Sequence, residues 1–282
     1  MPIPTHIDSL GHDELLLAAR AAEAAATIIR DGYGNKTTIR EKGIGDLVSE
    51  IDEQADQVIT KMIKQAYPAD VIVSEELQPN ADGAGAGRTW YVDPLDGTAA
   101  FLFRAGDDIP SVMIALADGQ EFVLGLMHFP LSGEWFYAVR GGGAYRNGEP
   151  LTATHDPATL GEAWVEMNHY GDVSYESPVF ASLRQLLRAP GGARLVTTPI
   201  PHSGVAMRLF DGSQKLGAII HDNNPAKVKQ GPWDTAAAQA IVEEAGGVFL
   251  NLKGERYDLR HPEPIVIAAN PAVASDIITL AK

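Results

Sequence analysis

The segment Trp90-Tyr91-Val92-Asp93-Pro94-Leu95-Asp96-Gly97-Thr98 is the most informative part of this 282-residue chain. Its three leading apolar residues end in Asp-Pro, which is typical of a β-strand that runs into a turn. Asp93 and Asp96 lie three residues apart on that turn, so both carboxylates can reach one hard cation. A helix is expected to begin at Gly97 and Thr98 and to run through Phe103, and free N–H groups at a helix start favour anions. The chemistry of phosphate esters requires at least a cation-binding site next to an anion-binding site.

The same segment has a plainer interpretation, an acidic turn whose side chains cap a helix. Two other known motifs are excluded by their spacing. An EF-hand loop that began at Asp93 would need a glutamate at its twelfth position, where the chain has Arg104. A phosphatase with an aspartyl nucleophile in a DxDGT motif would need its second aspartate two residues after the first, not three.

Further acidic residues lie where elements are expected to begin or end. The apolar run 71–73 leads into Ser74 and the acid pair Glu75 and Glu76, the segment 45–52 opens a periodic helix, and Asp234 stands near the start of an Ala-rich helix. Functional groups of α/β and α+β enzymes usually lie at such boundaries, whereas surface acids are scattered along helix faces. The placement of these acids therefore favours a functional site.

Taken in order, these motifs resemble the inositol monophosphatase family. That family belongs to the Mg²⁺-dependent, lithium-sensitive phosphatases, with fructose-1,6-bisphosphatases and 3′(2′),5′-bisphosphate nucleotidases as relatives. The resemblance spans residues 15–275. The matching motifs are Lys42 with Asp46-Leu47-Val48-Ser49 and Asp52; Ser74-Glu75-Glu76; the segment 90–98; and Trp233-Asp234-Thr235-Ala236-Ala237 with Ala245-Gly246-Gly247.

The resemblance implies a role for each matched position. The metal ligands would be the carboxylates of Glu75, Asp93, Asp96 and Asp234 and the backbone carbonyl of Leu95, holding two to three Mg²⁺ ions that Mn²⁺ could replace. Catalysis would fall to Asp52 and Thr98, which orient and activate the attacking water, together with Glu75. Asp46 and Glu76 would steer ligands or water without binding metal. Hard oxygen ligands suit Mg²⁺, and the expected reaction is in-line attack by water without a covalent phosphoenzyme.

The predicted fold combines helices and strands in both halves of the chain. Helices are expected at 13–29, 50–65, 203–210, 233–245 and 271–281, and strands at 111–117, 121–128, 134–139, 194–198, 216–221, 248–250 and 264–269. The first three of these strands should form an antiparallel meander, and the later alternation indicates helices layered on a sheet. The resemblance sharpens this α+β or α/β class to a layered αβαβα sandwich of the inositol monophosphatase type.

The same resemblance implies two lobes with the metal site between them. Residues 1–150 would form an N-terminal α+β lobe with the meander and most metal ligands, and residues 151–282 a C-terminal α/β lobe that supplies Asp234 and the specificity residues.

Substrate contacts are the least determined part of the prediction. The candidates are Gly97, Thr98, Ala206, Arg208, Asp222 and Lys227. Where family members that bind inositol have a glutamate, seven residues before Asp234, this chain has Lys227. Lys227 and Lys229 either contact a second phosphate or carboxylate or are exposed loop lysines, and Asp222 is an alternative to the missing glutamate. Arg208 stands where bisphosphate nucleotidases carry a lysine, or is a solvated helix residue; the pair 107–108 either meets substrate hydroxyls or faces water.

Three functions follow from these observations. The first is a Mg²⁺-dependent phosphatase that hydrolyses a small monoester, an inositol (cyclitol) or sugar phosphate. The second is a 3′(2′),5′-bisphosphate nucleotidase or a sugar bisphosphatase resembling fructose-1,6-bisphosphatase. The third is a sensor that binds metal and a phosphorylated ligand without turnover. Retention of every acid and of Thr98 argues against the sensor, which has no need of a pair that activates water.

Composition narrows the possible partners. The net charge of −15 disfavours binding to nucleic acid polymers or to anionic membranes. The absence of cysteine excludes disulfides and thiolate metal sites. No apolar run reaches the roughly 18 to 20 residues of a membrane span, and the first residues lack a signal-peptide pattern. We therefore expect a soluble cytoplasmic protein with a small phosphorylated substrate; the resemblance implies a homodimer.

Overall fold

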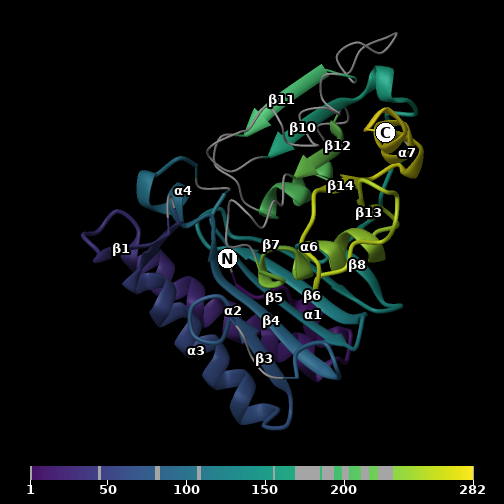
Figure 1. The fold of residues 1–282 in the computed structure, drawn as a ribbon. Helices are drawn as coiled ribbons and strands as arrows, with labels where there is room; N and C mark the ends of the chain where they lie inside the picture. Colours follow the sequence, from purple (N-terminus) through teal and green to yellow (C-terminus); the bar gives the residue numbers. More distant parts are fainter. Residues whose placement is uncertain are drawn as a thin grey trace.

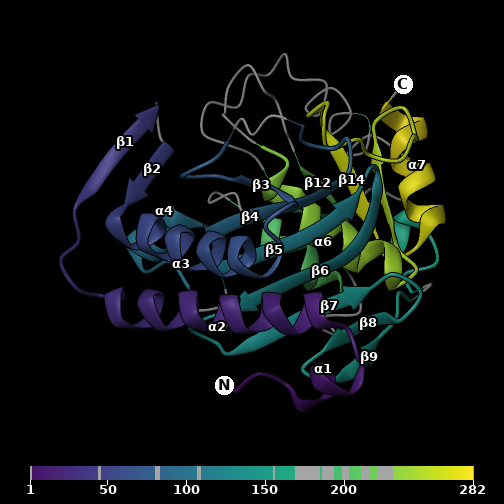
Figure 2. The ribbon, with the colours of Figure 1, turned by 90° about the horizontal axis from the view of Figure 1, so that it is seen from below.

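The computed structural model describes residues 2–43, 46–79, 83–106, 109–154, 156–168, 185, 194–198, 203–210, 216–221 and 231–281. Its helices are α1 Thr5–Ser9, α2 Asp13–Gly32, α3 Glu50–Ala66, α4 Thr98–Phe103, α6 Trp233–Glu244 and α7 Pro271–Ala281, with the 3₁₀ helices η1 Leu160–Glu162 and η2 Ser203–Phe210. Figures 1 and 2 show these elements in alternating layers: α2 and α3, a large sheet, α6 with η2, a second sheet, and α7. The predicted αβαβα sandwich is confirmed.

The described strands form a seven-stranded sheet, a five-stranded sheet and a hairpin. The large sheet contains, in spatial order, β3 Val71–Ser74, β4 Arg88–Asp96, β5 Ser111–Asp118, β6 Glu121–Phe129, β7 Glu134–Val139, β8 Gly143–Arg146 and β9 Glu149–Leu151. Within this sheet β3 and β4 pair in parallel, and the other neighbouring strands pair antiparallel. The predicted antiparallel meander of β5, β6 and β7 is therefore confirmed. Asn147 and Gly148, both with positive φ (53° and 94°), form the two-residue turn between β8 and β9.

Helices α2 and α3 cover one face of this sheet. Alanines at helical spacing line the buried side of α2 and let the helix approach closely. Helix α3 begins with a capping box, in which Ser49 accepts the N–H of Ile51 and the Asp52 carboxylate accepts the N–H of Ser49. The helix predicted at 50–65 is therefore confirmed, with its start at Glu50. Residues 46–49, which were expected to open this helix, form strand β2 instead.

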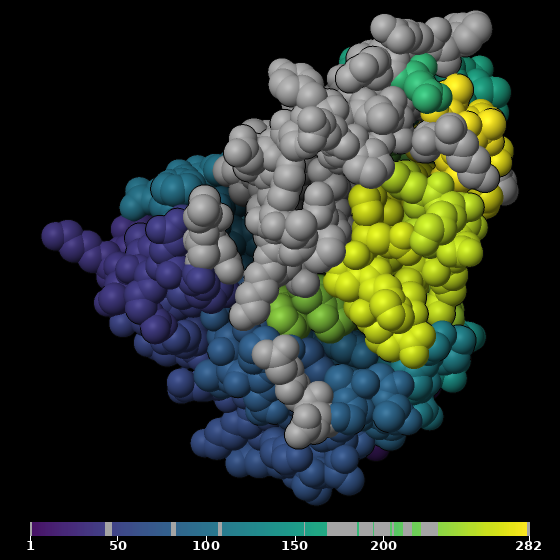
Figure 3. Space-filling view, viewed as in Figure 1, coloured from purple at the N-terminus to yellow at the C-terminus, as the bar shows by residue number. Residues whose placement is uncertain are grey.

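Strand β2 Asp46–Ser49 pairs with β1 Ile39–Gly43 in an antiparallel hairpin that was not predicted. Figure 3 shows this N-terminal segment projecting from the body, at the place labelled β1 in Figure 1. The charged sequence of β1 gives no apolar alternation, which explains why the strand was missed.

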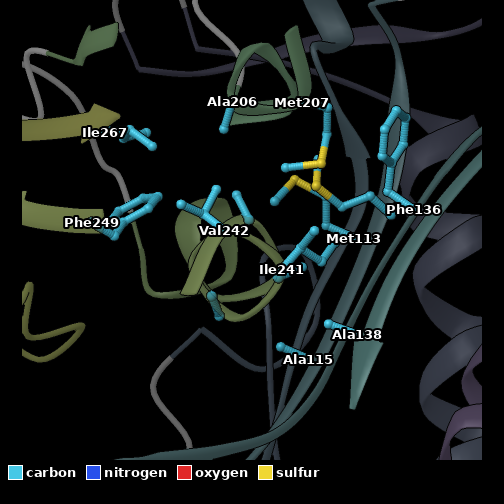
Figure 4. Close-up of a cluster of buried hydrophobic side chains, with 14 of the residues drawn as sticks. Met113, Ala115, Phe136, Ala138, Ala206, Met207, Ile241, Val242, Phe249 and Ile267 are labelled. Carbon is cyan, nitrogen blue, oxygen red and sulfur yellow. The ribbon is translucent and has the colours of Figure 1, made fainter. Parts of the chain in front are cut away.

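Helix α6 is packed between the two sheets. Ile241 and Val242 lie among residues of both sheets, including Met113, Phe249 and Ile267 (Figure 4). A Cβ atom on Gly125 of β6 would lie 2.7 Å from both the Ala237 carbonyl oxygen and the Ala240 Cβ. Small residues on both elements therefore allow a close contact that fixes α6, and with it Asp234, against the large sheet.

The second sheet has the order β11-β10-β12-β14-β13. Its strands are β10 Trp164–Asn168, β11 Arg194–Thr198, β12 Leu216–His221, β13 Val248–Asn251 and β14 Ile265–Ala268. Helix α7 packs on its outer face through Val273, Ala274 and Ile277. The helix predicted at 203–210 is a 3₁₀ helix, and the division into two lobes stays a prediction. Among the described residues, no helix is long and apolar enough to cross a membrane.

Candidate active site

A β-bulge at the end of β4 presents the two aspartates of the central motif. In the pairing with β5, Asp93 lies opposite Met113 and Asp96 lies opposite Ser111. An advance of three residues along β4 therefore corresponds to only two residues along β5, which defines the bulge. The Leu95 N–H donates a hydrogen bond to Asp93 Oδ1 at 3.0 Å. The prediction of a turn directly after Val92 is wrong, because the bulge absorbs the extra residue and the strand continues to Asp96. Gly97, with φ of +80°, then turns the chain into α4.

Asp52 and Thr98 are brought together from positions 46 residues apart. The Thr98 hydroxyl lies 2.8 Å from Asp52 Oδ1 and 3.0 Å from the Leu95 carbonyl oxygen. The other carboxylate oxygen, Oδ2, accepts the N–H of Ser49 at 2.9 Å and its hydroxyl at 2.5 Å. Burial raises the pKa of Asp52 to about 6, against the hydrogen bonds from Ser49 and Thr98. The side chain of Thr98 is thus held by a buried acid that is itself fixed by the helix cap.

The carboxylates predicted as metal ligands repel one another, and those of Asp93, Asp96 and Asp234 are buried. Burial first, and then the charges of Glu75, Asp96 and Asp234, hold the pKa of Asp93 well above its ordinary value. Burial and the charge of Glu75 have the same effect on the pKa of Asp234. Asp96 Oδ2 accepts the N–H of Gly204 at 3.0 Å, and Asp234 Oδ2 accepts the N–H of Gly231 at 2.6 Å. These carboxylates need a positive charge nearby to remain ionised.

One such charge is Lys42, at the end of the β1–β2 hairpin. Its Nζ lies 2.7 Å from Glu75 Oε1 and 2.8 Å from Glu76 Oε1. Burial disfavours the ammonium charge, but the attraction of the two glutamates and their hydrogen bonds raise the pKa of Lys42 above its ordinary value. The sequence motif included Lys42 without assigning it this contact.

The donor set fits a hard divalent cation. Within the described ranges, no three acidic or histidine side chains are already gathered in a geometry that holds an ion. The candidate donors are nevertheless all carboxylate or carbonyl oxygens, which Mg²⁺ prefers. The mutual repulsion that raises the pKa of Asp93 and Asp234 is the interaction that a bound cation would relieve.

The other predicted residues lie in varied surroundings. Gly97 and Thr98 form the start of α4, where the phosphate contacts are predicted. The Ala206 side chain is fully buried in the core between the sheets (Figure 4), so only its backbone could meet a substrate. Arg208 Nη1 lies 3.3 and 3.4 Å from the two carboxylate oxygens of buried Glu166.

Several predicted positions are not described by the structure. Asp222, Lys227, Lys229 and the pair 107–108 lie outside the described residues. Only the backbone of Asp46 is described, as part of β2, opposite Gly43.

Sequence reasoning missed Asp56, which holds the turn that carries Glu75. Asp56 Oδ2 accepts the N–H groups of Glu76 at 3.0 Å and Leu77 at 3.2 Å. Burial raises the pKa of Asp56 to about 6, opposed by hydrogen bonds from Glu76, Ser74 and Leu77. The spacing of four from Asp52 on one helix is the sequence signal that could have identified it.

Comparison with known proteins identifies the family. The profile of the inositol monophosphatase family matches residues 12–281. The chain therefore belongs to the inositol monophosphatase family, and the predicted family, fold and class of phosphoric monoester hydrolase are confirmed.

Similar proteins extend over nearly the whole chain. A fructose-1,6-bisphosphatase/inositol-1-monophosphatase of Aquifex aeolicus is 29% identical, covering 95% of this chain and 95% of that protein. A histidinol-phosphatase of Chlorobaculum parvum is 30% identical, covering 94% and 95%. The solved structure of the extragenic suppressor protein suhB from Bartonella henselae has a TM-score of 0.78 at 25% identity, covering 95% of this chain and 98% of that one.

Proposed function

We propose that this protein is a Mg²⁺-dependent phosphatase that hydrolyses a small phosphate monoester by attack of an activated water. The observation that supports the proposal most strongly is the hydrogen bond from Thr98 Oγ1 to the buried Asp52 carboxylate, beside the mutually repelling acids. A protein that only bound phosphate would gain nothing from a hydroxyl paired with a buried carboxylate.

Each residue has a distinct task in the proposed reaction. Glu75, Asp93, Asp96, Asp234 and the Leu95 carbonyl would hold Mg²⁺, two to three ions in all. Bound Mg²⁺ supplies the charge that neutralises a dianionic ester and stabilises the leaving oxygen. The Thr98 hydroxyl would accept a proton from water while passing its own to Asp52 Oδ1, 2.8 Å away. The water oxygen would then bond to phosphorus as the ester P–O bond breaks. The leaving oxygen would take up a proton from solvent water to give the alcohol, and Asp52 would return its proton to solvent through Thr98 as inorganic phosphate departs.

The substrate we favour is an inositol or sugar monophosphate. Arg208 is the described cation suggested for a second phosphate, but Glu166 lies 3.3 Å from it and weakens its attraction for anions. This pairing favours a monoester over a bisphosphate. The relatives' names, a bisphosphatase/inositol-1-monophosphatase and a histidinol-phosphatase, show that both sugar bisphosphates and amino alcohol phosphates belong in the test.

The test is release of inorganic phosphate from a panel of substrates with Mg²⁺ or with EDTA. The panel contains inositol 1-phosphate, fructose 1,6-bisphosphate, histidinol phosphate and a 3′(2′),5′-bisphosphate nucleotide. Mg²⁺-dependent release from a monoester supports the proposal, and preference for a bisphosphate supports the second function. No release from any compound by folded protein would refute a phosphatase and favour the sensor. A homodimer, proposed on the family resemblance, is tested separately by sedimentation, and the cytoplasmic location, proposed on the sequence, by cell fractionation.

A further inference from the structure

Asp56 connects the metal-ligand turn to the helix that carries Asp52. Its side chain is fully buried, and Oδ2 accepts the N–H groups of Glu76 and Leu77. Both N–H groups belong to the turn after β3, next to Glu75. In the described hydrogen bonds, Asp56 contacts the backbone N–H groups of Glu76 and Leu77 and no side chain of a predicted metal ligand.

The two aspartates of α3 act on neighbouring strands. Residues four apart share one face of a helix, so Asp52 and Asp56 project on the same side of α3. Asp52 reaches Thr98 beyond β4, and Asp56 reaches the turn beyond β3. Strands β3 and β4 are adjacent and parallel, with Ser74 opposite Val92. One helix face therefore spans the ends of two strands that carry different parts of the site.

We propose that Asp56 is a positioning residue, which fixes the turn after β3 so that Glu75 presents its carboxylate to Mg²⁺ at a set distance from the Asp52–Thr98 pair. This inference rests on the proposed function. It assigns to Asp56 an effect on metal affinity that acts through the backbone of Glu76 and Leu77.

Besides the contacts of Lys42 with the Glu75 and Glu76 carboxylates, the turn has backbone hydrogen bonds that show why the Asp56 carboxylate matters. The Glu75 N–H donates to the Val92 carbonyl at 3.1 Å, and Ser74 and Gln78 exchange backbone hydrogen bonds at 3.2 Å. These bonds fix the two ends of the turn, whereas Asp56 holds its middle. Asp56 Oδ1 is buried without a hydrogen-bond donor among the described residues. Such a buried acceptor lowers stability.

The test compares Asp56→Ala, Asp56→Asn and wild type in Mn²⁺ binding and in Mg²⁺-dependent kinetics. Mn²⁺ binding is measured without substrate, by electron paramagnetic resonance of the free ion. Asp56→Ala should weaken Mn²⁺ binding and raise the half-saturating Mg²⁺ concentration by about 10- to 100-fold, with a far smaller change of kcat at saturating Mg²⁺. Asp56→Asn keeps an oxygen that can accept both N–H groups, so it should restore most of the affinity.

Asp70→Ala is the matched control. Asp70 is also a buried aspartate, and its Oδ2 accepts the Trp90 Nε1–H at 2.9 Å, near the opposite ends of β3 and β4. The Asp70→Ala substitution should lower the melting temperature of the protein without changing its affinity for Mn²⁺. If Asp56→Ala does not fold, Asp56→Ser, whose shorter side chain ends before the turn, replaces it in the same comparison.

Four results would overturn the inference. Wild-type Mn²⁺ affinity in Asp56→Ala would remove the positioning role while leaving the phosphatase intact. An equal loss of affinity in Asp70→Ala or in Asp56→Asn would assign the effect to stability or to charge instead of hydrogen-bond geometry. Wild-type protein that binds no Mn²⁺ and releases no phosphate with Mg²⁺ would refute the proposed function itself, and this inference with it.

Discussion

The pH dependence of folding stability should be set in part by His128, which is buried between α2 and the large sheet. Its ring is fully buried and stacks on Trp135 with centroids 3.7 Å apart. Its Nδ1–H donates to the Glu134 carbonyl oxygen at 2.9 Å, while Nε2 lies 3.3 Å from Glu23 Oε2. Burial lowers the pKa of His128 from 6.5 to about 4, although the Glu134 carbonyl and Glu23 oppose the change.

The direction and size of the pH effect on stability follow from the difference between the pKa of His128 in the folded protein and its ordinary value. The folded state takes up the proton less readily than the unfolded state, so between pH 6.5 and 4 protons favour unfolding. Stability is unaffected above pH 6.5 and is lost progressively as pH falls toward 4. At about 1.4 kcal/mol per pH unit, the loss at pH 4 is about 3 kcal/mol. The buried carboxylates act in the opposite direction, because their raised pKa values stabilise the folded state in acid.

The measurement is therefore a difference between two proteins. Urea unfolding of wild type and His128→Gln at several pH values from 7.5 to 4 cancels the contribution of the carboxylates. Wild type should lose about 3 kcal/mol relative to the variant across this range. His261→Gln, at a side chain that is 76% exposed, is the matched control and should follow wild type. Parallel curves for wild type and His128→Gln would show that His128 does not contribute to the pH dependence of stability.

Three further perturbations test other parts of the account. Thr98→Val should lower kcat by about 10²- to 10⁴-fold, the usual contribution of general acid–base groups, with little change in Mn²⁺ binding; a wild-type kcat would remove Thr98 from the mechanism. Asp93→Asn should abolish phosphate release yet raise the melting temperature in EDTA, because the neutral amide relieves the repulsion from Glu75, Asp96 and Asp234; a lower melting temperature would contradict the repulsion. Gly125→Ala should destabilise the protein by about 1–3 kcal/mol in urea unfolding, since its Cβ would meet the Ala237 carbonyl oxygen at 2.7 Å; unchanged stability would show that α6 can shift freely.

Much of the layered fold follows from local sequence patterns. The predicted ranges of β7, β11, β12 and α7 coincide with the observed elements, because each combines a clear periodicity with turn residues at its ends. Strand β10 was missed, since Glu166 in its middle breaks the apolar pattern. That acid is buried because Arg208, distant in sequence, lies beside it. A contact between residues so far apart in the sequence cannot be predicted from a short stretch of sequence around either one.

The candidate site also combines features that are visible in the sequence with features that depend on tertiary contacts. Glu75, Asp96 and Asp234 each lie at or next to a terminus of an element, a position that is visible in the sequence. Asp93 was identified by the Asp-Pro that follows the apolar run, although the strand continues past it. The bulge between Asp93 and Asp96 depends on the register with β5, and the contact of Lys42 with Glu75 depends on a hairpin without an apolar pattern. The support of Asp96 by the Gly204 N–H is a backbone contact that carries no side-chain signature.

In the proposed active site, carboxylates from separate parts of the chain share divalent ions beside Thr98. Anomalous diffraction from crystals soaked in Mn²⁺ and inorganic phosphate tests this arrangement most directly. Manganese peaks are expected among Glu75, Asp93, Asp96 and Asp234, with phosphate at the start of α4. Full soaking with no peak among these oxygens, or with Mn²⁺ bound only elsewhere, would contradict it.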